Sequence, residues 1–137
     1  MKRIAFIDLG SNSVRFVIYE ISKTGSYRLI YQEKESVRLS ENMWGTHELT
    51  KEAMERSLRA LKGFVHMANA MEVDTIKAVA TAAVRLAKNG DAFIKAVKEL
   101  TGLNLECIAG EEEARLGFLG VCLLYTSPSP RDRTRYR

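Results

Sequence analysis

The sequence predicts an α/β protein built on a mixed five-stranded sheet with helices on both faces. Three short strand patterns joined by turns open the chain, and segments that alternate helix with strand follow them. Strands joined by a hairpin pair antiparallel, whereas strands joined through a helix pair in parallel. The expected element order is therefore βββαβαβα.

The first three strands are predicted at about residues 3–8, 14–21 and 27–33. Residues 23–26 (Lys-Thr-Gly-Ser) supply the turn between the second and the third. Apolar residues occupy both alternating sets of positions in the second strand, so we expect both of its faces to be covered. Residues 36–45 are predicted to form a loop, or a strand followed by a loop.

The first helix is predicted to begin after Thr50, whose side chain can cap it. Apolar residues recur along it in steps of three and four, which predicts one buried stripe made of Met54, Leu58, Leu61, Val65 and Ala68. A fourth strand is expected at residues 75–80, and a short helical turn at 82–87.

Asp91 is predicted to cap the next helix, whose apolar face would hold Phe93, Val97 and Leu100 and which would end at Gly102. A fifth strand then follows at residues 105–109, and Gly110 opens another helix.

This order is typical of the ribonuclease-H-like fold. In open α/β sheets, ligands bind where loops converge at the strand ends. Three features are expected at that edge: the turn at residues 10–13, Arg85 after the fourth strand, and the glutamates at 111–113 after the fifth.

The first turn is the most informative part of the chain. Asp8 ends an apolar strand, and the small polar residues Gly10, Ser11, Asn12 and Ser13 follow. Turn amides that converge on one point bind anions, and a carboxylate beside them can hold a divalent cation. The alternative is a plain hairpin with a Ser/Asn turn. We favour the phosphate site, because a carboxylate is costly to bury without a partner.

Composition is that of a soluble globular protein, with 46% hydrophobic and 28% charged residues. The net charge of +4 is largely due to residues 131–137, which hold four arginines and one aspartate. The rest of the chain is nearly neutral, which argues against nucleic-acid binding. We also expect a cytoplasmic protein, because no apolar run approaches the about 20 residues of a membrane span and no signal peptide is recognisable.

The cysteines and histidines are isolated from one another, so a metal site of Cys or His is not expected, and Cys107 is interpreted as reduced and partly buried. The pattern changes at residues 122–137, where both prolines and the arginine cluster lie. We interpret these residues as a disordered tail that is foreign to the native sequence. A basic tail that binds polyanions is the alternative.

Three stretches resemble the exopolyphosphatase and guanosine pentaphosphate phosphatase (Ppx/GppA) family, within the superfamily of sugar kinases, heat-shock chaperones and actins. They are residues 7–15 (Ile-Asp-Leu-Gly-Ser-Asn-Ser-Val-Arg), 80–85 (Ala-Thr-Ala-Ala-Val-Arg) with Asn89, and 110–116 (Gly-Glu-Glu-Glu-Ala-Arg-Leu) with Gly120-Val121. They span nearly all of residues 1–121 in the right order. Other members of the superfamily usually carry a Gly-Thr type of turn in the first hairpin.

The resemblance implies a role for each matching position. Asp8 would lie near the Mg²⁺ ion, and residues 10–13 would form the first phosphate loop. Arg85 would face the phosphate chain, and Glu113 would be the catalytic base. The two glutamates before Glu113 are then ordinary acids of a helix start.

The resemblance implies that residues 1–121 are the N-terminal lobe of a phosphoanhydride hydrolase. Its substrate would be inorganic polyphosphate or guanosine pentaphosphate, attacked by water with the help of Mg²⁺. The family's second phosphate loop and second lobe are absent here, so we expect this chain alone to be inactive, and the parent protein to be a homodimer. The alternatives are a small-molecule kinase and a non-catalytic lobe that binds phosphate or nucleotide.

Overall fold

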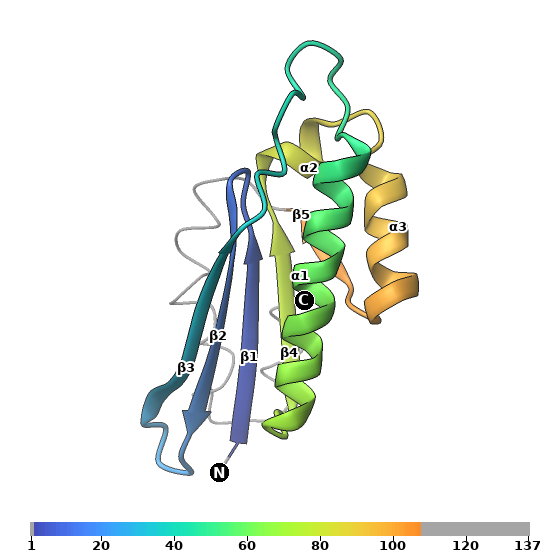
Figure 1. The fold of residues 1–137 in the computed structure, drawn as a ribbon. Coiled ribbons are helices and arrows are strands. Elements are labelled where there is room, and N and C mark those ends of the chain that lie inside the picture. Colours follow the sequence, from blue (N-terminus) through green and yellow to red (C-terminus); the bar gives the residue numbers. More distant parts are fainter. Residues whose placement is uncertain (1, 108–137) are drawn as a thin grey trace.

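The computed structural model describes residues 2–107, which form one mixed sheet with three helices (Figure 1). The elements in chain order are β1 (Lys2–Leu9), β2 (Ser13–Ile21), β3 (Tyr27–Ser36), α1 (Lys51–Ala70), β4 (Thr75–Ala80), α2 (Ala82–Leu86), α3 (Gly90–Thr101) and β5 (Leu105–Cys107). The helix predicted from Gly110 and the predicted tail at 122–137 lie outside the described residues.

The sheet has the order β3-β2-β1-β4-β5. The three N-terminal strands pair antiparallel, β4 pairs parallel to β1, and β5 pairs parallel to β4. The predicted mixed five-stranded sheet is therefore confirmed. Both connections to the parallel strands contain a helix, as expected, because a chain that returns to the same end of a sheet needs a crossover.

Two apolar clusters lie on opposite faces of the sheet. One face packs against α1 and α3, where the ring of Phe16 stacks on that of Phe64 with centroids 4.8 Å apart (Figure 1). The side chains that alternate with this set are also buried: Ile4, Phe6, Val17, Tyr19, Ile21 and Val79. The prediction that β2 is covered on both sides is thus confirmed.

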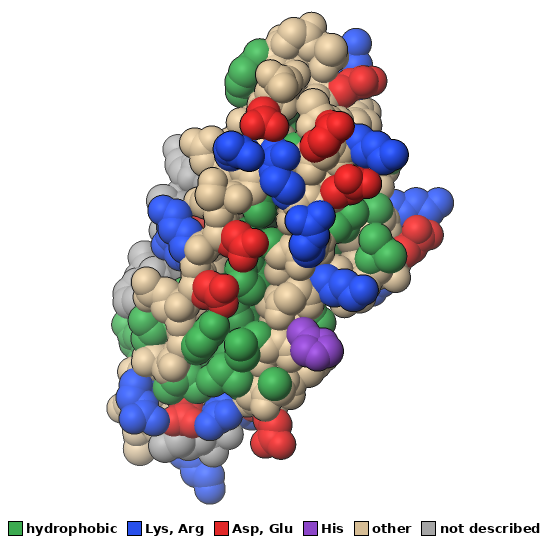
Figure 2. Space-filling view, viewed as in Figure 1, with side chains coloured by type: hydrophobic (Ala, Val, Ile, Leu, Met, Phe, Trp, Pro, Cys, Tyr) green, Lys and Arg blue, Asp and Glu red, His purple; other side chains and the backbone are tan. Residues whose placement is uncertain are grey.

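The surface that carries α1 mixes charges of both signs. Figure 2 shows Lys and Arg side chains interspersed with Asp and Glu, and hydrophobic side chains gathered in the lower half of the view. Among residues 2–107, no helix is long and apolar enough to cross a membrane.

Helix α1 begins as predicted but faces the sheet with a different set of residues. The Thr50 side chain accepts a hydrogen bond from the Ala53 amide at 3.1 Å and so caps the helix. The buried residues are Ala53, Ser57, Ala60, Leu61, Phe64 and Ala68, whereas Met54, Leu58 and Val65 of the predicted stripe are only partly buried. The buried stripe is rotated from the predicted one and takes in the polar residue Ser57. This residue can be buried because its hydroxyl donates to the Ala53 carbonyl at 2.9 Å.

The prediction that Asp91 caps α3 is wrong. Asn89 occupies the cap position, and its side chain makes no capping bond. The Asn89 amide instead accepts from the Leu49 N–H at 2.9 Å and donates to the Leu49 carbonyl at 3.0 Å, which ties α3 to the segment before α1. Leu100 is 59% exposed and lies off the predicted apolar face, whereas the stop at left-handed Gly102 (φ 81°) is confirmed.

Gly90 is the first residue of α3 and lies against the backbone of Val84 in α2. A Cβ atom at this position would lie 2.1 Å from the Val84 carbonyl oxygen. We expect Gly90→Ala to lower the free energy of unfolding by about 1–3 kcal/mol, because the backbone must shift to relieve the overlap. Urea unfolding of the 137-residue chain measures this.

Gly63 is the matched control for that substitution. It lies on the exposed side of α1, and nothing is within 4 Å of the site of its Cβ. Gly63→Ala should stabilise the protein by roughly 0.5–1 kcal/mol, since alanine is the better helix former. Equal effects of the two substitutions would show that the Gly90 contact is unimportant.

Candidate functional site

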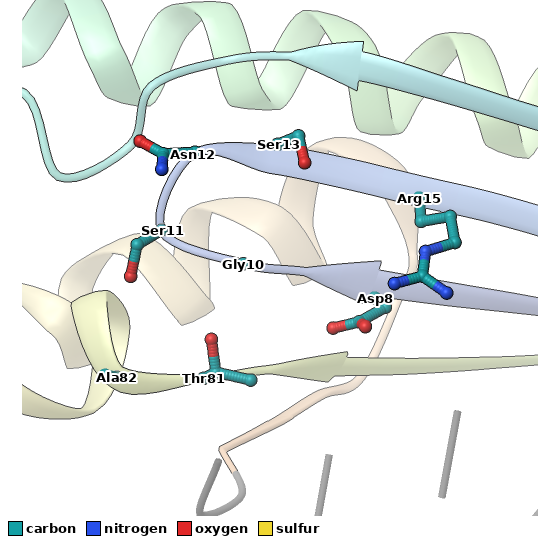
Figure 3. A pocket seen from close by; sticks show the side chains of 8 residues that line it. All are labelled: Asp8, Gly10, Ser11, Asn12, Ser13, Arg15, Thr81 and Ala82. Atoms are coloured by element: carbon teal, nitrogen blue, oxygen red, sulfur yellow. The ribbon is translucent and has the colours of Figure 1, made fainter. Parts of the chain in front are cut away.

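A cavity of about 350 Å³ opens at the edge of the sheet where β1 and β4 end and β2 begins. Asp8 reaches it from the face opposite α1, because it alternates along β1 with Ile7 and Leu9 of the α1-side core. The lining residues are Asp8, Gly10, Ser11, Asn12, Ser13, Arg15, Thr81 and Ala82 (Figure 3). The structure therefore brings together all of the predicted residues of the first hairpin.

The hairpin tip is held by its own backbone and by the loop after β3. The Gly10 N–H donates to the Ser13 carbonyl at 2.9 Å. The Asn12 carbonyl accepts from the amides of Val37 and Arg38, at 3.0 and 2.7 Å. The Ser11 carbonyl accepts from the Ser40 amide at 3.0 Å. The carbonyls of Ser11 and Asn12 therefore accept hydrogen bonds from the loop after β3, which fixes the position of the tip.

Hydroxyl groups face the pocket from the tip. Figure 3 shows the side chains of Ser11 and Ser13 turned toward the side where Asp8 and Thr81 lie, with Asn12 at the outer end of the turn. Hydroxyls and turn amides are the groups that bind phosphate oxygens without adding charge.

Asp8 is buried with one oxygen unused. Its side chain is 7% exposed, and Oδ1 has no hydrogen-bond partner. Arg15 lies directly opposite on β2, and its guanidinium is beside the carboxylate in Figure 3, but no ion pair joins these two described residues. Within the described residues no protein group supplies the partner that the sequence predicts for this carboxylate, so a ligand as that partner stays a prediction. In native proteins a buried acceptor without a protein partner is ordinarily satisfied by a water or an ion, or has a catalytic role.

The donors present fit a magnesium ion shared with a ligand, rather than a metal enclosed by protein. Within residues 2–107, no group of three or more His, Cys, Asp or Glu side chains could hold a metal. Mg²⁺ characteristically takes one or two carboxylates and fills its remaining positions with water and phosphate oxygens. The free Oδ1 of Asp8 suits that pattern.

Of the two remaining predicted residues, Arg85 does not line this pocket and Glu113 is not among the described residues. Arg85 lies on α2 at the same edge of the sheet, but its side chain is exposed and does not line the cavity (Figure 1). Glu113 and its neighbours at 111 and 112 lie outside the described residues. The roles that the resemblance implies for Arg85 and Glu113 stay predictions.

Thr81 and Ala82 also line the pocket, although the sequence did not predict a role for either residue. Both follow the last residue of β4, at the carboxyl end of a strand parallel to β1. Their position directly after a predicted strand could have identified them in the sequence, because ligands bind at the carboxyl ends of parallel strands.

Cys107 is not among the residues that line this pocket. The prediction of a partly buried thiol is wrong: Cys107 is a free, exposed residue at the end of edge strand β5. Desolvation and then the Asp91 carboxylate raise the pKa of the thiol, so it is protonated at neutral pH.

The family profile for Ppx/GppA phosphatases matches residues 17–131. The chain belongs to the Ppx/GppA phosphatase family. Among relatives of this Ppx/GppA protein is the guanosine-5'-triphosphate,3'-diphosphate pyrophosphatase of Pseudoalteromonas atlantica, 41% identical over 123 residues. That alignment takes in 90% of this chain and 24% of the relative, so the chain spans about a quarter of the length of that enzyme.

Solved structures of the Ppx/GppA family have the same architecture. The family member from Aquifex aeolicus is similar with a TM-score of 0.81 and 33% identity, over 93% of this chain and 41% of its own. An exopolyphosphatase from Cytophaga hutchinsonii is similar with a TM-score of 0.79 and 32% identity, over 88% of this chain and 38% of its own. The predicted ribonuclease-H-like, actin-like fold is confirmed.

Proposed function

We propose that this chain is the N-terminal lobe of an enzyme that transfers a terminal phosphate from a phosphoanhydride to water. Its substrate would be inorganic polyphosphate or guanosine pentaphosphate. The observation that carries the proposal is the Asp8 carboxylate, buried with a free oxygen beside a hairpin tip rich in hydroxyls. The names of the relatives from Pseudoalteromonas atlantica and Cytophaga hutchinsonii support the two substrates.

The chain's own residues would bind the terminal phosphate in the pocket. The tip at residues 10–13 would hold its oxygens through its hydroxyls and through turn amides other than that of Gly10, which donates to Ser13. The Arg15 guanidinium, which faces the same pocket, would offset their charge. Asp8 would hold Mg²⁺ through Oδ1, and the metal when bound neutralises charge that develops on the phosphate. Because a phosphoryl group needs little covalent help, holding it in line with the attacking water is most of the catalysis.

Two further roles rest on the family resemblance. Glu113 would accept the proton of the attacking water, and Arg85 would offset charge further along the phosphate chain. Since the chain spans 41% of the Aquifex aeolicus protein, the proposed activity is that of a complete protein containing this lobe.

Phosphate release with water as the acceptor tests the proposal. A complete family member that carries this lobe should release inorganic phosphate from polyphosphate with no nucleotide present, or from guanosine pentaphosphate as the sole nucleotide, and chelation of Mg²⁺ should stop it. A kinase would need an acceptor molecule, and a non-catalytic lobe would bind without turnover. Release of phosphate from either substrate only when a separate small-molecule acceptor is added would contradict hydrolysis.

A further inference from the structure

Thr81 is fixed in place by its backbone on both sides. Its N–H donates to the carbonyl of Leu9, the last residue of β1, at 3.2 Å, and its own carbonyl accepts from the Arg85 amide at 3.2 Å. The residue is 5% exposed. Thr81 is therefore held rigidly beside the start of the hairpin tip, between the strand that carries Asp8 and the helix that follows β4.

The hydroxyl of Thr81 is left without a role in the fold. Thr81 stands at the cap position of α2, where a threonine side chain ordinarily accepts from a helix amide, but it makes no capping bond. No hydrogen bond joins its hydroxyl to another residue within 2–107. Figure 3 shows this hydroxyl pointing across the pocket toward the hairpin tip. Asp8 Oδ1, and not the Thr81 hydroxyl, is the unpartnered side-chain atom that is fully buried among the described residues, so this hydroxyl opens to the pocket and is available to a ligand there.

We propose that the Thr81 hydroxyl donates a hydrogen bond to an oxygen of the phosphate group held at the hairpin tip, an inference that rests on the function proposed above. The tip contacts that phosphate from the β1–β2 side, and Thr81 contacts it from β4. The carboxylate of Asp8 cannot serve as a donor, so a hydroxyl beside it supplies the hydrogen bond that the phosphate needs there. Thr81 is thus a substrate-binding residue that the fold itself does not require.

Two substitutions at Thr81 separate the hydroxyl from the shape of the side chain. Thr81→Val keeps the branched shape and removes the hydroxyl, whereas Thr81→Ser keeps the hydroxyl. The affinity of the 137-residue chain for inorganic tripolyphosphate, with Mg²⁺ present, is followed by ³¹P NMR titration. We expect Thr81→Val to bind about tenfold or more weakly, as for a lost hydrogen bond to a charged group, and Thr81→Ser to stay near the original affinity.

Thermal unfolding without ligand distinguishes this role from a structural one. Thr81→Val should unfold at the same or a higher temperature, because no bond within the described fold is lost. Thr101→Val is the matched control: the Thr101 hydroxyl donates to the Val97 carbonyl at 2.6 Å and accepts from the Leu103 amide at 3.2 Å. That variant should lower the unfolding temperature and leave tripolyphosphate binding unchanged.

The outcomes distinguish the two proposals. If the original chain binds tripolyphosphate and Thr81→Val binds it equally well, the Thr81 inference is overturned and the proposed function stands. If Thr81→Val loses binding only in proportion to a lowered unfolding temperature, Thr81 is structural and the inference is again overturned. If the original chain does not bind tripolyphosphate, the Thr81 inference is overturned, whereas the proposed function is decided separately by phosphate release from the complete protein.

Discussion

Replacing Asp8 with asparagine is expected to abolish Mg²⁺-dependent phosphate release by a complete protein that carries this lobe. The substitution keeps the shape of the side chain but removes the charge that would hold the metal at Oδ1. A loss of at least about 10³-fold in kcat, equivalent to about 4 kcal/mol of transition-state stabilisation, is expected for a metal-positioning carboxylate.

The same substitution should leave the ligand-free lobe at least as stable. Oδ1 of Asp8 is buried without a partner, so neutralising the carboxylate removes an unpaired charge and breaks no hydrogen bond to that atom. Asp91→Asn, at an exposed position in the first turn of α3, is the control and should leave turnover unchanged. Near-normal turnover of Asp8→Asn at ordinary Mg²⁺ concentrations would exclude Asp8 from metal binding.

Replacing Glu113 with glutamine is expected to lower kcat of the complete protein by roughly 10²–10⁴-fold, with little change in substrate affinity. A general base acts on the attacking water and not on the bound substrate, so its loss affects the chemical step. Steady-state kinetics of phosphate release separates the two effects, because KM should stay near its original value.

The neighbouring glutamates are the matched controls for Glu113. Glu111→Gln and Glu112→Gln carry the same change in charge within the same run of the sequence. Each is expected to change stability by a few tenths of a kcal/mol and turnover hardly at all. A dispensable Glu113 beside an essential Glu111 or Glu112 would show that the catalytic base has been assigned to the wrong residue.

Strand and turn positions could be predicted well because each rests on local chemistry. The alternation of apolar residues and the turn at 23–26 place β2 and β3, and Thr50 marks the start of α1. The choice between antiparallel and parallel pairing followed from the same signals, since the connection lengths decide between hairpin and crossover, but the order of the strands in the sheet did not. The hairpin-tip pocket was predictable for the same reason: Asp8 and residues 10–13 are neighbours in the sequence.

What could not be predicted depends on contacts between distant segments. Nothing near Asn89 in the sequence shows that its side chain is engaged by Leu49, which leaves the cap of α3 without it. The burial of Ser57 depends on which side of α1 meets the sheet, and its hydroxyl is then satisfied within the helix by the Ala53 carbonyl. Thr81 enters the pocket because β4 lies beside β1, and that depends on the pairing of two strands far apart in the chain.

The loop after β3 holds the hairpin tip through main-chain atoms at both ends of every bond, from the amides of residues 37, 38 and 40 to the carbonyls of Ser11 and Asn12. Relatives can therefore differ at the exposed positions of this loop and still keep the shape of the tip, whereas the buried side chains of Val37 and Leu39 belong to the core. The length of the loop is more constrained, because a deletion would displace the amides that donate to the tip. A proline at residue 37, 38 or 40 would likewise remove one of these hydrogen bonds. In designing variants of this protein, the loop is a place to change surface chemistry by substitution and not by insertion or deletion.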